Sequence, residues 1–209
     1  MYKTVDSCNK EWGKHMLLRN QDTMKLKKGS IIHECGEYAI LNGYVVCKTG
    51  DHLLKIMKQG TFTITEEHFF GKLIQYQAQA ELHVERLPML SATDFLQKQA
   101  KAQSEMMHNL TRQLDLYALP VKERVMALLY RIACEIGEFR YAECRIPAVL
   151  TQVEVANYAH CTREYLNGIR KALIADQWLA PEKNWVLLDW DRWGEYIFHI
   201  EKRASEGTL

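Results

Sequence analysis

Residues 150–173, LTQVEVANYAHCTREYLNGIRKAL, decide the fold of this chain. Thr151 followed three residues later by Glu154 is the T-x-x-E pattern of a capping box, which predicts that a helix begins there. His160 and Cys161 would form a short turn before a second helix. Two short helices joined by a tight turn are typical of a helix-turn-helix unit.

The second predicted helix has an apolar face and a polar face. Thr162 would cap it, and Leu166, Ile169 and Leu173 recur at helical spacing, so they would be buried. The opposite face would carry Arg163, Glu164, Asn167, Gly168 and Lys171. An arginine and a glutamate in the first turn of such a helix can hydrogen-bond to the base edges of guanine and cytosine, respectively. The alternative is an ordinary helical hairpin with a solvated charged face.

The segment that follows predicts a wing. Residues 177–180 and 185–188 have strand patterns and flank the polar turn PEKN at 181–184. A strand, a turn and a strand after such a helix pair are typical of a winged helix, so we expect a DNA-binding winged helix over residues 120–209. The candidate base or phosphate contacts are Thr151, Gln152, Thr162, Arg163, Glu164, Asn167, Gly168, Lys171 and Lys183, with Arg170 as a further local charge.

The first ninety residues predict an antiparallel β-roll. The candidate strands are 25–33, 38–47, 53–57, 61–65 and one or two more within 82–90. Asn42-Gly43 is a type I′ hairpin signal, and glycines at 50 and 60 mark further turns. Short strands at this spacing favour a small roll or barrel over residues 1–90.

Residues 91–119 contain no glycine or proline and many helix formers. A helix of about 25 residues spans roughly 40 Å, more than a small roll needs. We therefore predict a dimerisation helix that pairs with its own copy; a connector packed on its own domain is the alternative. The predicted interface is Leu96, Met106, Leu110, Leu114 and Tyr117. Two more helices are predicted over 121–137 and 191–203, with an extended connection over 139–149.

Composition narrows the class of protein. The 209 residues are 47% hydrophobic and 25% charged, as in an ordinary globular protein. No apolar run reaches membrane-spanning length and the N-terminus has no signal-peptide pattern, so we expect a cytoplasmic protein without membrane contact. Six scattered cysteines fit a reducing compartment. The net charge of +1 means that any attraction to phosphates must come from local placement.

In this order, roll, long helix and winged helix resemble the CRP/FNR superfamily of bacterial transcription regulators over essentially the whole chain. The match is carried by the helix-turn-helix with its C-[ST]-R-E start at 161–164, by KKGSIIHECGEYAILNGYV at 27–45, and by Phe70-Gly71-Lys72-Leu73 in place of the family's F-G-E-L. The resemblance implies an α+β homodimer that binds near-palindromic double-stranded DNA, with RNA polymerase as a candidate partner.

The departures from the family bear on the ligand and the operator. Lys72 stands where cyclic-AMP-binding members have the ribose-binding glutamate, and QAQAEL at 77–82 lacks the arginine that holds the phosphate. Without that charge-assisted hydrogen bond we expect no cyclic-nucleotide binding, and the effector is unknown. Gly168 replaces an arginine that many members carry, so the operator would be related to the family's half-site but not identical.

Cofactor signals are weak. Cys8 is alone at the N-terminus, which excludes the family's iron–sulfur ligand set, and no spacing singles out a haem ligand among His15, His33, His52, His68 and His83. We therefore expect neither cofactor nor metal. Cys8, Cys35 and Cys47 are candidates for a redox switch, whereas Cys134, on a buried face, and Cys161 would be packing residues.

No catalytic motif is present, so an enzyme is not expected. The local cluster Glu66-Glu67-His68 is interpreted as a solvated loop. The rival function is a small-molecule-binding or redox-sensing roll whose C-terminal domain makes protein–protein contacts.

Overall fold

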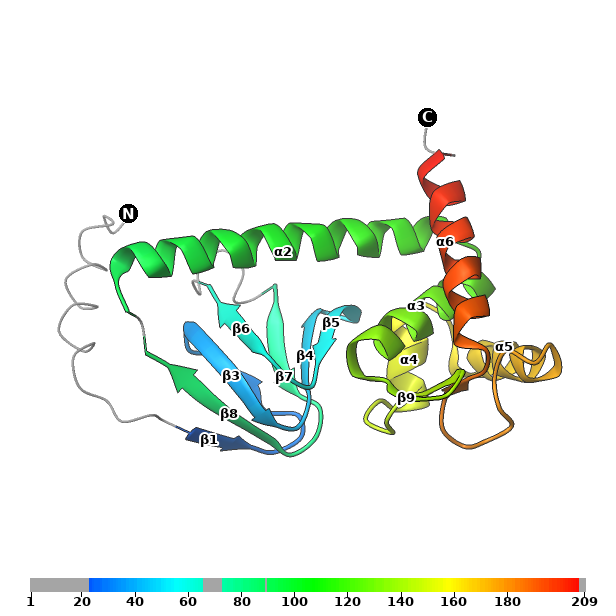
Figure 1. Cartoon of the computed structure of the whole chain (residues 1–209), viewed down its shortest axis with the longest axis horizontal. Coiled ribbons are helices and arrows are strands. Elements are labelled where there is room, and N and C mark those ends of the chain that lie inside the picture. Colours follow the sequence, from blue (N-terminus) through cyan, green and yellow to red (C-terminus); the bar gives the residue numbers. More distant parts are fainter. Residues whose placement is uncertain (1–22, 66–72, 89, 207–209) are drawn as a thin grey trace.

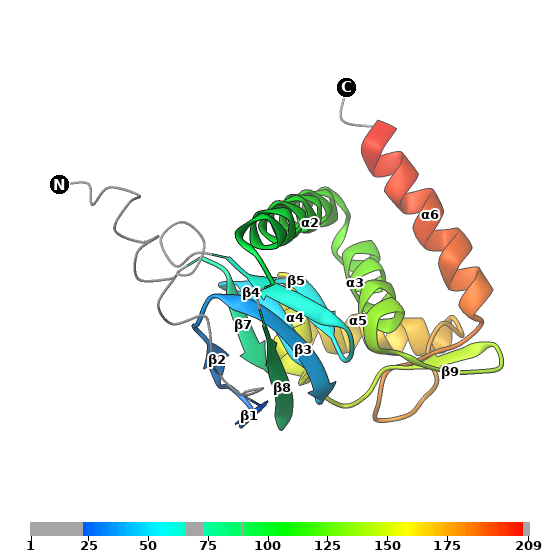
Figure 2. The ribbon, with the colours of Figure 1, turned by 60° about the vertical axis from the view of Figure 1, so that its left-hand side comes forward.

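A computed structural model describes residues 23–65, 73–88 and 90–206. The N-terminal roll lies under the first part of one long helix, α2, and the remaining helices gather at the other end of that helix (Figure 1). Turned by 60°, the molecule shows α2 lying over the strands of the roll (Figure 2). The architecture confirms the predicted α+β class, in which a β-roll, a long helix and a winged helix follow one another.

The roll consists of two four-stranded antiparallel sheets, ordered β1-β8-β3-β6 and β2-β7-β4-β5. Their core contains Tyr38, Val45 and Leu82, none of which is exposed. The strands are β1 (Thr23–Leu26), β2 (Ile31–Ile32), β3 (Gly36–Asn42), β4 (Val45–Thr49), β5 (His52–Met57), β6 (Thr61–Ile64), β7 (Gln75–Ala78) and β8 (Leu82–Leu87).

The predicted hairpin at Asn42-Gly43 is wrong. Strands β3 and β4 belong to different sheets, and the chain crosses between the sheets at Gly43. Gly43 has a φ of +99°, and an added Cβ would lie 2.3 Å from the carbonyl oxygen of Glu81. The crossing therefore needs a glycine with positive φ, as a type I′ turn does, so the same residues give the same signal. The segments 25–33 and 38–47, each predicted as one strand, are likewise two strands in separate sheets.

Helix α2 (Ala92–Ala118) begins at Ser91, whose side chain accepts a hydrogen bond from the backbone N–H of Asp94 at 3.1 Å. It ends at Leu119, before Pro120, where a proline cannot continue the helix. Lys98 lies 2.6 Å from Glu37 of β3, which ties the helix to the roll.

The C-terminal domain comprises α3 (Val121–Ile136), β9 (Glu138–Arg140), β10 (Glu143–Arg145), α4 (Gln152–Tyr158), α5 (Arg163–Ala175), β11 (Val186–Leu187) and α6 (Trp190–Glu206). Strands β9, β10 and β11 form one small sheet, so the predicted extended connection over 139–149 contains a hairpin. The core contains the fully buried Trp193, with Ile197 and Ile200 on the same face of α6. Cys134 is exposed rather than buried, which corrects its assignment as a packing residue.

The roll and the C-terminal domain share a core. Val46, Leu53 and Ile56, from the outer side of β4 and β5, belong to the same buried cluster as α3 and α6. The two parts therefore pack as one body. In the part of the chain that the structure describes, no helix is long and apolar enough to cross a membrane.

Candidate nucleic-acid interface

The first helix of the pair is fixed by the capping box that the sequence predicted. The Thr151 side chain accepts from the Glu154 N–H at 3.2 Å, and the Glu154 carboxylate accepts from the Thr151 N–H at 2.7 Å. Glu154 also accepts from the side-chain amide of Gln79 in the roll. Burial would raise the pKa of Glu154, but these hydrogen bonds together hold it below its ordinary value. The hydroxyl of Thr151 is thus already used inside the chain, and Gln152 is half-buried.

The turn between α4 and α5 is built on His160, which has a φ of +49°. Its N–H donates to the carbonyl of Asn157 at 2.9 Å, and the N–H of Cys161 donates to the carbonyl of Ala156 at 3.0 Å. Burial, with the charges of His52 and Arg124, lowers the pKa of His160. These bonds end α4 and set the direction in which α5 leaves.

Helix α5 presents an open face. Thr162 caps it by accepting from the Tyr165 N–H at 3.2 Å, and Leu166, Ile169 and Leu173 are buried as predicted. The exposed residues include Arg163, Glu164, Gly168 and Lys171, whereas Asn167 is half-buried. An added Cβ on Gly168 would meet nothing within 4 Å. Another molecule can therefore approach the backbone of α5 closely at Gly168.

Tyr165 is a surface residue that the sequence prediction missed. Its side chain is 56% exposed in the first turn of α5. Its spacing of three residues before Gly168 places it beside the open face, and this spacing was the available signal.

The wing is held against α5 by Arg170. The guanidinium lies 4.8 Å from the ring centroid of Trp185 and donates to the carbonyls of Glu182 and of Lys183, the latter at 2.8 Å. Burial lowers its pKa. Arg170 therefore positions the wing turn and is not a free charge on the surface. The side chain of Lys183 is exposed at this turn.

The two sides of α2 differ. Leu96, Met107 and Leu114 are each more than 60% exposed and, with the half-buried Leu110, form what we call the open stripe. Met106 and Tyr117 are half-buried: Met106 lines a cleft against the roll, to which Met107 also contributes, and Tyr117 contacts His52 and His160. The predicted interface residues are thus divided between two sides of the helix.

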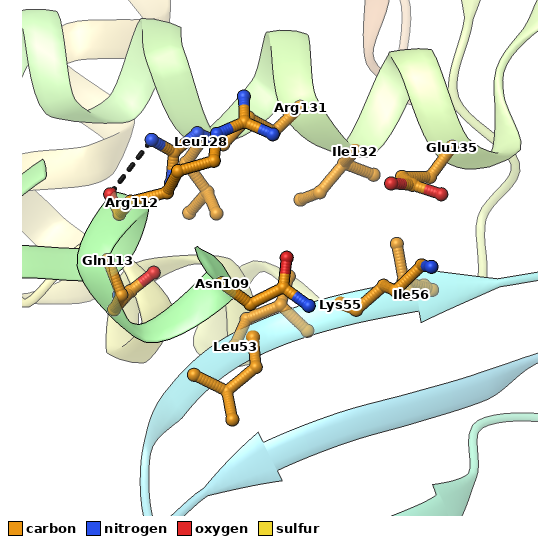
Figure 3. Close-up of a pocket in the computed structure, with 11 residues that line it drawn as sticks. Leu53, Lys55, Ile56, Asn109, Arg112, Gln113, Leu128, Arg131, Ile132 and Glu135 are labelled. Atoms are coloured by element: carbon orange, nitrogen blue, oxygen red, sulfur yellow. Dashed lines mark hydrogen bonds between the residues drawn. The ribbon is translucent and has the colours of Figure 1, made fainter. Parts of the chain in front are cut away.

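Several clefts adjoin α2 in the described part of the chain, and two of them are informative. The first lies between α2, β6 and β7, and its described lining contains no arginine or lysine. The cleft next to it shares Thr63, Tyr76 and Met106 with it and is also lined by Lys55. The second lies between β5, α2 and α3, where Arg131 donates to the carbonyl of Arg112 at 2.8 Å (Figure 3). Burial, with the neighbouring Arg112, lowers the pKa of Arg131 to about 10. The second cleft thus lies where the long helix α2 meets α3 of the C-terminal domain.

The cysteine candidates differ in environment. Cys47 is buried, and burial raises the pKa of its thiol to about 12, which argues against a reactive thiolate. Cys35 is half-buried in the roll. Cys8, Lys72 and His68 lie outside the described residues. Within the described chain no three His, Cys, Asp or Glu side chains are grouped so as to hold a metal ion.

The chain matches no protein-family model. No curated protein matches it either. Among solved structures it is similar to a transcriptional regulator of the CRP/FNR family from Thermus thermophilus, with 21% identity, a TM-score of 0.67, and 85% of this chain and 98% of the other covered. FixK2 from Bradyrhizobium japonicum gives 13% identity and a TM-score of 0.64 over 85% and 97% of the two chains.

The c-di-GMP-responsive global regulator CLP from Xanthomonas campestris gives 16% identity and a TM-score of 0.61 over 80% and 93%. At these identities the comparisons establish the fold. The chain has the fold of the CRP/FNR regulators from the roll through the winged helix.

Proposed function

We propose that this protein is a homodimeric, sequence-specific DNA-binding transcription regulator. The observation that carries the proposal is the open face of α5, with Arg163 and Glu164 in its first turn and Lys171 farther along. The opposite face of α5 is apolar and buried, and the wing, which Arg170 positions, lies beside the helix. A recognition helix in a major groove needs a buried face that anchors it to its domain and a polar face that is open to the DNA.

Dimerisation is the second element of the proposal. The open stripe of α2 exposes large apolar side chains along one side of a 27-residue helix. A second copy of the same helix would cover this stripe and place two recognition helices about 34 Å apart, which fits a near-palindromic operator. RNA polymerase remains a candidate partner that no residue singles out.

The decisive experiment is selection of bound sites from random duplexes with the purified protein, followed by titration of the selected site. Lys171→Ala should weaken binding on all sequences and reduce the salt slope by about one, because one phosphate contact is lost. Lys101→Ala, an exposed lysine on α2, is the matched control and should change nothing. If no duplex is enriched, the protein does not read DNA sequence and the proposal is overturned.

The dimer has its own test. Leu110→Glu combined with Leu114→Glu places unpaired charges in the open stripe and should yield a monomer by sedimentation, with operator binding lost. Leu41→Glu, at an exposed leucine of the roll, should leave the dimer intact. A double variant that still sediments as a dimer would exclude the stripe as the interface.

A further inference from the structure

Three side chains from three separate elements meet where the roll, α2 and the winged helix join. They are His52 at the start of β5, Tyr117 near the end of α2, and His160 in the turn between α4 and α5. Tyr117 Oη lies 2.6 Å from His160 Nε2 and also contacts His52 Nδ1, while the two imidazole nitrogens are 2.7 Å apart. Three polar atoms therefore form a closed triangle.

Hydrogen bonds can align on only two sides of this triangle. Each ring nitrogen offers either one N–H or one lone pair, directed outward in the plane of its ring. The phenol, which also accepts from the side-chain amide of Gln113 at 3.3 Å, can donate to one nitrogen and accept from the other, which uses both nitrogens. The remaining contact, between His52 Nδ1 and His160 Nε2, is then left without a well-placed hydrogen. Three ligand-type atoms this close to one another can instead surround a single cation.

We propose that His52 Nδ1, His160 Nε2 and Tyr117 Oη bind one divalent transition-metal ion of the Zn²⁺ type, with water as the fourth ligand. Imidazole nitrogen is a preferred ligand of zinc, copper, nickel and iron. Two nitrogens bound to tetrahedral zinc lie about 3.3 Å apart, given Zn–N distances of about 2.0–2.1 Å. An outward movement of the exposed His160 would lengthen its distances to both partners, and Tyr117 Oη and His52 Nδ1 would also have to move apart on binding. On binding, the phenol releases its proton to solvent and both imidazoles are neutral.

The surroundings allow an ion to enter. His160 is exposed, and Asp51, beside His52, is the acidic group whose charge acts on His160. The positive group nearby, Arg124, lies 5.7 Å from the ring centroid of Tyr117 and donates to the carbonyls of Leu119 at 3.1 Å and Ala159 at 3.3 Å. The phenolate formed on binding offsets part of its charge.

A bound ion would fix the helix-turn-helix turn to the roll and to the end of α2. Because His160 precedes the cap of α5, the ion would set the orientation of the recognition helix. This consequence rests on the proposed function, whereas the metal site itself does not.

The test uses the untagged full chain, freed of metal with a chelator and titrated with Zn²⁺ by calorimetry, and with Co²⁺ as a coloured substitute. We expect one ion per chain, a higher thermal midpoint, and tetrahedral Co²⁺ absorption. His52→Asn and His160→Asn should each weaken Zn²⁺ binding at least tenfold, on the order of the loss seen on altering a metal site's supporting groups. Tyr117→Phe should abolish the release of its phenolic proton. His33→Asn and His199→Asn, both exposed, are the matched controls and should bind as the parent does.

The outcomes separate cleanly. Absence of Zn²⁺ and Co²⁺ binding by the folded parent chain overturns the proposal, as does equal binding by the folded double variant of His52 and His160. Binding of the ion without any enriched duplex would retain the metal site and reject the proposed regulator. Enriched duplexes without ion binding would do the reverse.

Discussion

The winged helix and the roll differ in how far apart in sequence their determinants lie. In the winged helix the capping box joins Thr151 to Glu154, and the second cap joins Thr162 to Tyr165. In the roll, β1 pairs with β8, so that Thr23 lies opposite Glu85. The first kind of contact is visible as a short motif, and the second is not. The surface proposed to read DNA is therefore encoded by residues close together in sequence, whereas the roll depends on pairing between distant segments.

The two regions are nevertheless coupled. Gln79, in the QAQAEL segment at 77–82, is buried and donates to Glu154 and to the carbonyl of Val149 at 3.1 Å. Lys58 donates to the carbonyls of Ile136 and Gly137 at the end of α3, at 3.3 and 3.2 Å. Polar groups of the roll thus hydrogen-bond to the winged helix. A substitution that destabilises either region should therefore destabilise the other as well.

The largest expected effect tests this coupling. Trp193→Ala removes a fully buried ring whose N–H donates to the Trp178 carbonyl at 3.2 Å, and should cost about 3–5 kcal/mol of unfolding free energy. Tyr38→Ala, its counterpart in the roll, should cost a similar amount. Because the regions share a core, calorimetry should show one transition that moves in both variants. Two transitions, each sensitive to only one variant, would break the coupling and leave two independent domains.

A smaller effect concerns base discrimination. Glu164 is exposed, and a carboxylate near phosphates is favourable only if it meets a cytosine amino group or stabilises the helix N-terminus. Glu164→Ala should relax preference at one base pair per half-site by about 1–3 kcal/mol. Glu195→Ala, an exposed glutamate on α6, should leave the selected consensus unaltered. An unchanged consensus in Glu164→Ala would assign the acid to capping alone.

Substitution of Gly168 tests whether the polar face of α5 is open to solvent. Gly168→Ala should raise the unfolding free energy by up to about 1 kcal/mol, because alanine favours a helix interior and its Cβ meets nothing within 4 Å. Gly137→Ala is the contrast, since its Cβ would lie 2.3 Å from Cys144 Sγ and should destabilise. Denaturant titrations measure both. A destabilised Gly168→Ala variant would show that the face of α5 is covered in solution.

The smallest expected effect belongs to the roll. Cyclic AMP should not change the thermal midpoint, because no arginine lines the described part of the cleft between α2, β6 and β7 or of the cleft that adjoins it, where Lys55 is the one basic residue among the described ones. Binding at 100 times the dissociation constant would contribute about 2.7 kcal/mol, which a thermal-shift measurement detects readily. A clear shift would mean that the roll binds cyclic nucleotides, and the expectation drawn from its sequence would be wrong.

The wing strand predicted over residues 177–180 is wrong, because Leu179 makes only a single bridge, to Leu187 of β11. The order of parts, both helix caps, the buried face of α5 and the polar turn of the wing could be predicted from the sequence alone. These features depend on side chains within four residues of one another or on helical periodicity, so a linear pattern specifies them. It also identified Arg163, Glu164 and Lys171 as surface residues, because a residue opposite a buried helical face must be open.

Which contacts form between distant segments is seen only in the folded chain. There β3 and β4 lie in different sheets, Arg170 binds the carbonyls of the wing, the predicted interface residues of α2 lie on two sides of the helix, and His52 Nδ1 lies 2.7 Å from His160 Nε2, 108 positions away. Spacing along the chain carries no information on such pairs, because their approach is set by how the roll, α2 and the winged helix bury a common core.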